Sequence, residues 1–105
     1  IDATTAISGS GPAYVFFFMQ AMMEAAREMG FSASESELLV SQTFKGAVDL
    51  YNKSNLSCEE WISRVASKGG TTEAALRSFT KGTLHKDIIS GAQAALARAK
   101  ELGEG

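Results

Sequence analysis

The sequence contains few of the residue types on which most binding and catalytic sites depend. Its 105 residues include one cysteine, one histidine and one proline. The single cysteine, Cys58, cannot form an internal disulfide, and no grouping of His, Cys, Asp or Glu has the spacing of a metal site. Because an unpaired cysteine is typical of a reducing compartment, we expect a cytoplasmic protein without a bound metal.

Long charged runs and long apolar runs are also missing. The formal net charge is -2, and no three charged residues stand in a row, so there is no basic cluster for nucleic acid to bind. The most apolar stretch, residues 13–26, is interrupted by Gln20 and Glu24 and is shorter than the roughly 20 apolar residues of a membrane-spanning helix. Residues 1–10 lack the basic start of a secretory signal. We therefore expect neither a nucleic acid nor a membrane as partner.

The residues that are present predict an all-α fold. With 45% hydrophobic residues and a single proline, the chain suits one helical domain over residues 1–105. Residues 1–11 are predicted to be a lead-in that ends in the turn-prone run from Ser8 to Gly11. Pro12 then suits the first turn of a helix that runs to about Met29 and stops at Gly30.

Four further helices follow from capping residues and from apolar residues three or four apart. The second should be opened by Ser34 with Glu37, and the third by Ser57 with Glu60. A fourth begins near Glu73 and is closed by Gly82, and a fifth is capped by Thr83. The predicted ranges are 35–52, a short helix after residue 57, 73–80 and 83–102. The chain is thus predicted to have about five helices.

The first helix is apolar around most of its circumference. Its polar residues share one narrow stripe, formed by Gln20, Glu24, Arg27 and Glu28. A helix of this kind is usually buried on most of its surface, which a small domain achieves by pairing with a second copy of itself. We expect a homodimer, and the alternative is a first helix surrounded by the other four within one chain.

The richest candidate site is the segment from Ser67 to Glu73, which reads Ser-Lys-Gly-Gly-Thr-Thr-Glu. Glycines beside a helix start allow backbone N–H groups to converge on an anion, and the helix dipole adds partial positive charge. A small carboxylate or a phosphate would suit these groups. The residues alone leave a simpler interpretation open, namely a tight interhelix turn in which Thr71 or Thr72 is the N-cap.

The remaining polar residues offer weaker candidates. The small residues from Ser8 to Gly11 permit close approach of a ligand or of another domain, although such runs are more often entry turns. His85 is expected at a solvated helix end, and Cys58 has no partner that would activate its thiol. Glu24 and Glu28 are four residues apart, with Arg27 beside them, and this favours a solvated stripe over acid–base chemistry.

Two segments together resemble one known family. The run Ile-Ser-Gly-Ser-Gly-Pro-Ala-Tyr at residues 7–14 and the run Ser-Lys-Gly-Gly-Thr-Thr-Glu-Ala-Ala-Leu at 67–76 are similar to the pyrroline-5-carboxylate reductases. Residues 25–30 resemble the end of that family's dimerisation helix. The resemblance covers nearly all of the chain but only the second domain of such an enzyme. It implies an intertwined helical dimerisation domain, similar to the C-terminal domain of 6-phosphogluconate dehydrogenase, and the N-terminal Rossmann domain is expected to be absent here.

The resemblance also implies an activity, a cofactor and an assembly. Members reduce 1-pyrroline-5-carboxylate to L-proline with NADPH or NADH, which the missing N-terminal domain mainly binds, so this chain alone should be inactive. They form homodimers, which often assemble into rings of dimers. The alternatives are the helical domain of another imino-acid reductase or dehydrogenase, and a helical oligomerisation module without any catalytic role.

Residue roles follow from the resemblance position by position. Ser67, Gly69, Gly70, Thr71 and Thr72 would hold the substrate carboxylate through N–H groups and hydroxyls. The Thr72 hydroxyl, the one catalytic group implied, would lie near the ring nitrogen that gains a proton.

The resemblance implies a role for three further residues, and two residues depart from the family's usual pattern. Ser10, Gly11 and Pro12 would line the junction with the nicotinamide. Lys68 stands where the family usually has proline, and Asn55 is the nearest match to a family glutamate.

Overall fold

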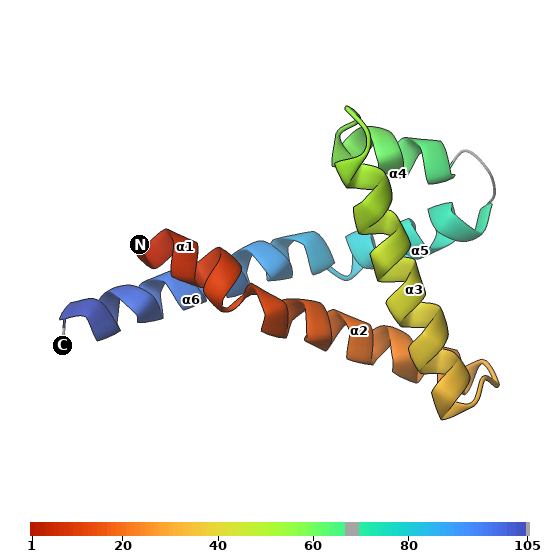
Figure 1. Cartoon of the computed structure of the whole chain (residues 1–105), viewed down its shortest axis with the longest axis horizontal. Coiled ribbons are helices and arrows are strands. Elements are labelled where there is room, and N and C mark those ends of the chain that lie inside the picture. Colours follow the sequence, from red (N-terminus) through yellow and green to blue (C-terminus); the bar gives the residue numbers. More distant parts are fainter. Residues whose placement is uncertain (67–69, 105) are drawn as a thin grey trace. The chain divides into compact units, whose positions relative to one another are not determined.

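The structure, a computed structural model, describes residues 1–66 and 70–104. Within these ranges every regular element is helical and no strand occurs, which confirms the all-α prediction. Five long helices are present, as predicted, with ends that differ from the predicted ends by a few residues. In chain order (Figure 1) the elements are α1 (Asp2–Thr4), the π-helix η1 (Thr5–Gly9), α2 (Gly11–Glu28), α3 (Ala33–Asn52), α4 (Cys58–Ala66), α5 (Gly70–Lys81) and α6 (Leu84–Glu104).

The lead-in segment is helical rather than a turn, so that prediction was wrong. Residues 2–9 form α1 and η1, and only Ser10 separates them from α2. Ala6 is 3% exposed, and both α1 and η1 lie against α6. This packing stabilises a helical conformation that the Ser and Gly residues do not favour by themselves, because tertiary contacts outweigh weak local propensities.

The end of α2 follows the prediction for Gly30. This residue has a φ of 108°, a left-handed conformation that glycine adopts without a steric penalty. The Gly30 amide donates to the Arg27 carbonyl at 3.0 Å, and the Phe31 amide donates to the Ala26 carbonyl at 3.2 Å. These two bonds form a Schellman motif, which satisfies carbonyls that the helix end would otherwise leave unpaired.

Capping boxes open α3 and α4. The pair Ser57 and Glu60 exchanges bonds of 3.0 and 3.1 Å, as predicted. At α3 the prediction was wrong, because the pair is Ser32 with Glu35, at 2.8 and 3.1 Å, and not Ser34 with Glu37. Ser34 lies inside the first turn of α3, whereas a capping side chain must stand before the helix.

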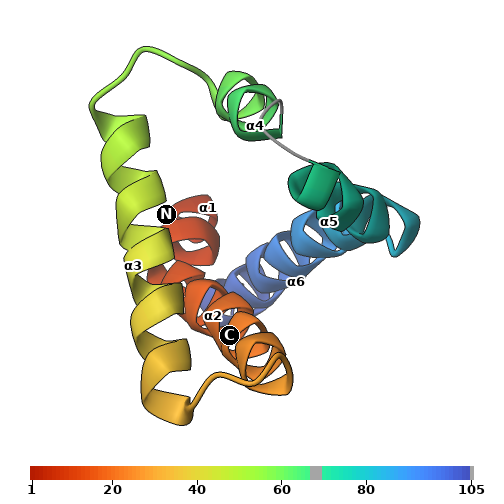
Figure 2. The same ribbon diagram turned by 90° about the vertical axis from the view of Figure 1, so that its right-hand side faces the viewer.

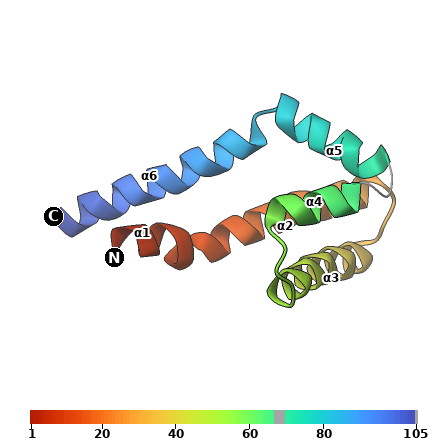
Figure 3. The same ribbon diagram turned by 90° about the horizontal axis from the view of Figure 1, so that it is seen from above.

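The chain divides into two compact units. The first contains residues 1–14 and 69–105, and its described part consists of α1, η1, the start of α2, α5 and α6. Helix α6 lies beside α1 and η1 (Figures 1 and 3) and also contacts α5. A turn through Gly82 and Thr83 joins α5 to α6, and Thr83 has a left-handed φ of 67°. Gly82 closes α5 as predicted, and Thr83 stands directly before α6.

The second unit contains residues 15–68, and its described part consists of most of α2 together with α3 and α4. The short connection after Gly30 turns the chain from α2 into α3 (Figure 2). The rings of Phe18 on α2 and Phe44 on α3 meet edge to face, with centroids 5.7 Å apart. In the connection to α4, the Trp61 indole donates to the Ser54 hydroxyl at 2.8 Å.

Helix α2 remains largely uncovered within the single chain. None of its residues is buried, and Phe16 and Phe17 are 66% and 70% exposed. None of the described helices is both long enough and apolar enough to cross a membrane.

Candidate functional site

The best-supported site in the described chain is the N-terminus of α5. This helix begins at Gly70, and Thr71 and Thr72 complete its first three residues. The N–H groups of a first turn have no acceptor within the helix, and the dipole of a 12-residue helix adds partial positive charge at the same end. Gly70, Thr71 and Thr72 therefore provide three converging N–H donors for an anion.

The predicted carboxylate loop is described from Gly70 onward. Ser67, Lys68 and Gly69 lie outside the described residues, so their predicted contributions stay predictions. Residue 70 also begins α5 earlier than the predicted start at Glu73. Both threonines thus lie within the helix rather than before it, and neither is its N-cap.

The hydroxyls of Thr71 and Thr72 are available to a ligand. Thr72 is half-buried and Thr71 is exposed, and neither hydroxyl is hydrogen-bonded within the part of the chain that the structure describes. Farther along the helix, the Thr80 hydroxyl donates to the Leu76 carbonyl at 2.9 Å. The hydroxyls of Thr71 and Thr72 make no such bond with the described residues, so they can bind a group outside the helix.

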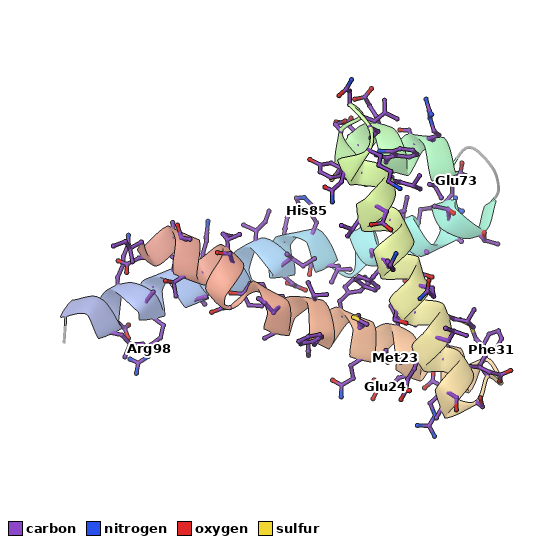
Figure 4. All side chains as sticks on the ribbon, in the orientation of Figure 1. Met23, Glu24, Phe31, Glu73, His85 and Arg98 are labelled. Carbon is purple, nitrogen blue, oxygen red and sulfur yellow. The ribbon has the colours of Figure 1, made fainter. Side chains whose placement is uncertain are left out.

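A glycine at position 70 is not required by the surroundings. Its φ is not in the left-handed region, and a Cβ at this position meets no described atom within 4 Å. Because neither the backbone conformation nor the described neighbours require glycine here, its presence suits close approach by a ligand. Glu73 follows in the same turn (Figure 4). The helix dipole favours the negative charge of Glu73, but this charge also repels an incoming anion.

One face of α5 carries an open hollow beyond this first turn. It is lined by Glu73, Leu76, Arg77, Thr80 and Lys81. Since these residues all belong to one helix, the hollow is a surface that other atoms must cover before it can enclose a ligand.

The second predicted segment, from Ser10 to Pro12, joins η1 to α2. The Ser10 amide donates to the Thr5 carbonyl at 2.8 Å, and the Ser10 carbonyl accepts from the Ala13 amide at 3.0 Å. Pro12 is the second residue of α2, where its missing N–H is harmless. A Cβ at Gly11 meets nothing within 4 Å, so neither packing nor backbone conformation requires glycine there.

The two predicted segments belong to the same unit but do not meet. Views along two directions (Figures 1 and 3) place η1 beside α6, with the start of α5 beyond the opposite end of α6. The first turn of α5 forms no hydrogen bond with Ser10, Gly11 or Pro12 in the described structure. One chain therefore does not bring both segments to a single ligand.

The weaker candidates are all exposed. His85, the second residue of α6, and Cys58, the first residue of α4, are exposed. Glu24 and Glu28 are exposed on α2 (Figure 4). No cluster of three or more possible metal ligands occurs among the described residues.

Two side-chain hydrogen bonds were not predicted. The Tyr14 hydroxyl donates to the Ala6 carbonyl at 2.8 Å, and the Trp61 indole is bonded to Ser54. In each pair the partners lie outside a common helix, eight and seven residues apart. Periodicity could not have revealed them.

Comparisons with known proteins agree over nearly the full chain. Residues 1–102 match the family model described as pyrroline-5-carboxylate reductase dimerisation. A pyrroline-5-carboxylate reductase of Pseudomonas aeruginosa is 42% identical over 104 residues, which cover 99% of this chain and 38% of that protein. Pyrroline-5-carboxylate reductase 2 of Bacillus subtilis is 38% identical over 99% of this chain and 37% of that protein. The chain thus spans less than two fifths of these relatives.

Solved structures give the same picture. The NADP-bound pyrroline carboxylate reductase of Plasmodium falciparum is similar with a TM-score of 0.93 and 35% identity, over 97% of this chain and 39% of that one. A pyrroline-5-carboxylate reductase of Coxiella burnetii is similar with a TM-score of 0.91 and 40% identity, over 96% and 37% respectively.

Proposed function

This chain belongs to the pyrroline-5-carboxylate reductase dimerisation family, and on that premise we propose that it supplies two parts of such an enzyme. One part is the contact between two copies of the protein. The other is the anchor for the carboxylate of 1-pyrroline-5-carboxylate, which the complete enzyme reduces to L-proline. The observation that carries the second part is the first turn of α5, where three N–H groups and two free hydroxyls stand together.

The anchor acts by orienting the substrate. A carboxylate at Gly70 and Thr71 accepts N–H bonds and gains from the helix dipole. Fixing this group also fixes the ring, so that its imine carbon can meet a hydride donor in one orientation. Ser67 and Gly69, which precede the helix in the sequence, are proposed to complete the anchor.

The Thr72 hydroxyl is proposed to serve the nitrogen end of the imine. When the carbon receives hydride, the ring nitrogen becomes an amine and needs a proton. A hydroxyl beside the nitrogen can donate a hydrogen bond and relay a proton from water. Thr72 is half-buried, and its hydroxyl is not engaged by described residues, as this role requires.

NADPH or NADH is the proposed reductant, and it supplies the hydride when bound. The similar Plasmodium falciparum protein holds NADP. Ser10, Gly11 and Pro12 are proposed to face the nicotinamide, because their side chains are small or absent and a Cβ at Gly11 would meet no described atom within 4 Å. The cofactor is proposed to be held mainly by an N-terminal domain of the complete protein.

The partner is proposed to be a second copy of the same chain. The N-terminal half of α2 is apolar all round, and Phe16 and Phe17 are mostly exposed. Beyond them, Gln20 and Glu24 continue the same face, as their spacings of three, four and seven residues require. Only the first half of this face therefore needs a partner. A dimer also supplies a second copy of each site segment, and a ring of such dimers in the cytoplasm is the proposed assembly.

The test uses the complete protein that contains this chain, with NADPH-dependent reduction of 1-pyrroline-5-carboxylate as the readout. We expect Thr72→Val, which removes the hydroxyl at nearly constant volume, to lower kcat/KM by about 10- to 100-fold. Thr72→Ser should retain most activity. The matched control is Thr80→Val, eight residues along the same helix, where the hydroxyl bonds only to its own helix.

The outcomes separate the three functions considered. Equal activity of Thr72→Val and wild type would favour an oligomerisation module without a catalytic role. A preference for a six-membered cyclic imino acid over the five-membered one would favour another imino-acid reductase. Loss in Thr72→Val alone would support the anchor and the proposed reaction.

A further inference from the structure

The residue Tyr14 holds the turn that precedes α2. In an α-helix the Ser10 amide would donate to the Ala6 carbonyl, four residues earlier. It donates instead to the Thr5 carbonyl, five residues earlier, at 2.8 Å, which is the bond pattern of a π-helix. The Ala6 carbonyl thereby loses its α-helical donor, and the Tyr14 hydroxyl provides another at 2.8 Å.

This bond encloses the segment proposed to face the nicotinamide. It reaches from the first turn of α2 back to η1, across Ser10, Gly11 and Pro12. Its acceptor is firmly placed, since Ala6 is 3% exposed and η1 lies against α6. The segment is therefore held at Ser10 by a backbone bond and across its whole length by Tyr14.

The packing of the described chain does not require glycine at positions 9 and 11. A Cβ at Gly11 meets nothing within 4 Å, and one at Gly9 meets only the Thr5 side chain at ordinary distances of 3.6 and 4.0 Å. Neither glycine has a left-handed φ. Glycines that the chain itself does not require suit close approach by a group outside the chain. They lie at a π turn, and π turns occur frequently at functional sites.

We propose that Tyr14 is a positioning residue for the nicotinamide side of the active site. It does not touch the cofactor. Its hydroxyl fixes the π turn, so that Ser10, Gly11 and Pro12 present their backbone in one conformation. The inference rests on the proposed function, because it takes these three residues as the cofactor-facing segment.

The experiment replaces Tyr14 by Phe in the complete protein, which removes only the hydroxyl. We expect the KM for NADPH to rise about fivefold, the equivalent of one neutral hydrogen bond. The KM for the imine should change by less than about twofold. Hydrogen exchange of the Ser10 and Gly11 amides should become faster, and adding the dinucleotide should restore most of their protection.

The matched control is Tyr51→Phe. Tyr51 is the other tyrosine of the chain, is 49% exposed on α3, and its hydroxyl has no hydrogen-bond partner among the described residues. This variant should match wild type in both KM values and in exchange.

Several results would overturn the inference. One is an unchanged KM for NADPH with faster amide exchange, which would make the bond purely structural. Another is an equal rise in both KM values, or the same rise in Tyr51→Phe. A wild type that does not reduce the imine refutes the proposed function instead. In that case the Tyr14 role is judged by exchange alone, and dinucleotide that fails to slow the exchange of Ser10 and Gly11 in Tyr14→Phe overturns it.

Discussion

The most informative perturbation of the proposed dimer is Phe17→Ala on α2. Phe17 is 70% exposed in the single chain. For an aromatic side chain of about 200 Å², this leaves about 140 Å² for a partner to cover, worth roughly 3.5 kcal/mol at about 25 cal/mol per Å². A two-fold dimer contains the contact twice, so the variant should lose about 7 kcal/mol, on the order of 10⁵-fold in the dimer dissociation constant.

The assay is sedimentation equilibrium of this chain over a wide concentration range. Because Phe17 makes little contact within one chain, the variant should keep the helical circular dichroism of wild type. The control is Glu24→Ala, seven residues farther along the same face of α2 and exposed, which should leave the constant nearly unchanged. A Phe17→Ala constant within threefold of wild type would refute the reasoning, as would an equal effect of Glu24→Ala.

Three other expectations concern stability and are measured by urea unfolding. Ser32→Ala removes the hydroxyl that caps α3 and should lower the free energy of unfolding by about 1 kcal/mol. Ser34→Ala should change it little. A larger loss in Ser34→Ala than in Ser32→Ala would mean that Ser34 with Glu37 is the capping pair. Thr83→Gly should stabilise the chain by about 0.5–1 kcal/mol, because Thr83 is held at a φ of 67° that a β-branched residue tolerates poorly. A loss of stability would show that the Thr83 side chain matters more than its backbone. The bonds from the Ser32 and Ser57 backbone amides lower the pKa of Glu35 and Glu60 below the ordinary 4.5. Their unfolded forms thus bind more protons, and this stability should be complete above about pH 4.5 and fall as the pH drops through the lowered pKa values. Replacing both acids by Gln should flatten this part of the pH profile, and an unchanged profile would contradict the assignment.

Sequence reasoning was most successful where a single residue decides the backbone. Gly30 was predicted to end α2 because glycine alone adopts its conformation readily, and the φ of 108° confirms this. Ser57 with Glu60 was predicted correctly for a similar reason, since no competing pair stands nearby. The order of five long helices followed from these punctuating residues and from apolar spacing.

Sequence reasoning failed where two capping pairs have the same spacing, and where contacts between distant residues determine the local conformation. Ser32 with Glu35 and Ser34 with Glu37 have the same spacing, and only the actual start of α3 selects between them. The helical lead-in depends on packing against α6, which no local pattern reveals.

For the candidate site, the motif predicted a helix start just after Gly70, Thr71 and Thr72, whereas α5 begins at Gly70. Their helical position, which removes the N-cap interpretation for both threonines, became clear only from the backbone. The π turn and its bond from Tyr14 involve one extra residue per turn and a separation of eight residues. Neither has a sequence period.

The most direct test of the carboxylate anchor is a titration of the isotope-labelled chain, followed by the backbone amide resonances of Gly70, Thr71 and Thr72. L-Proline carries the carboxylate and the ring, whereas pyrrolidine carries only the ring. The account predicts saturable shifts of these three resonances with proline and none with pyrrolidine. Proline that leaves them unchanged, or pyrrolidine that shifts them equally, would contradict the proposal that this helix start holds the substrate.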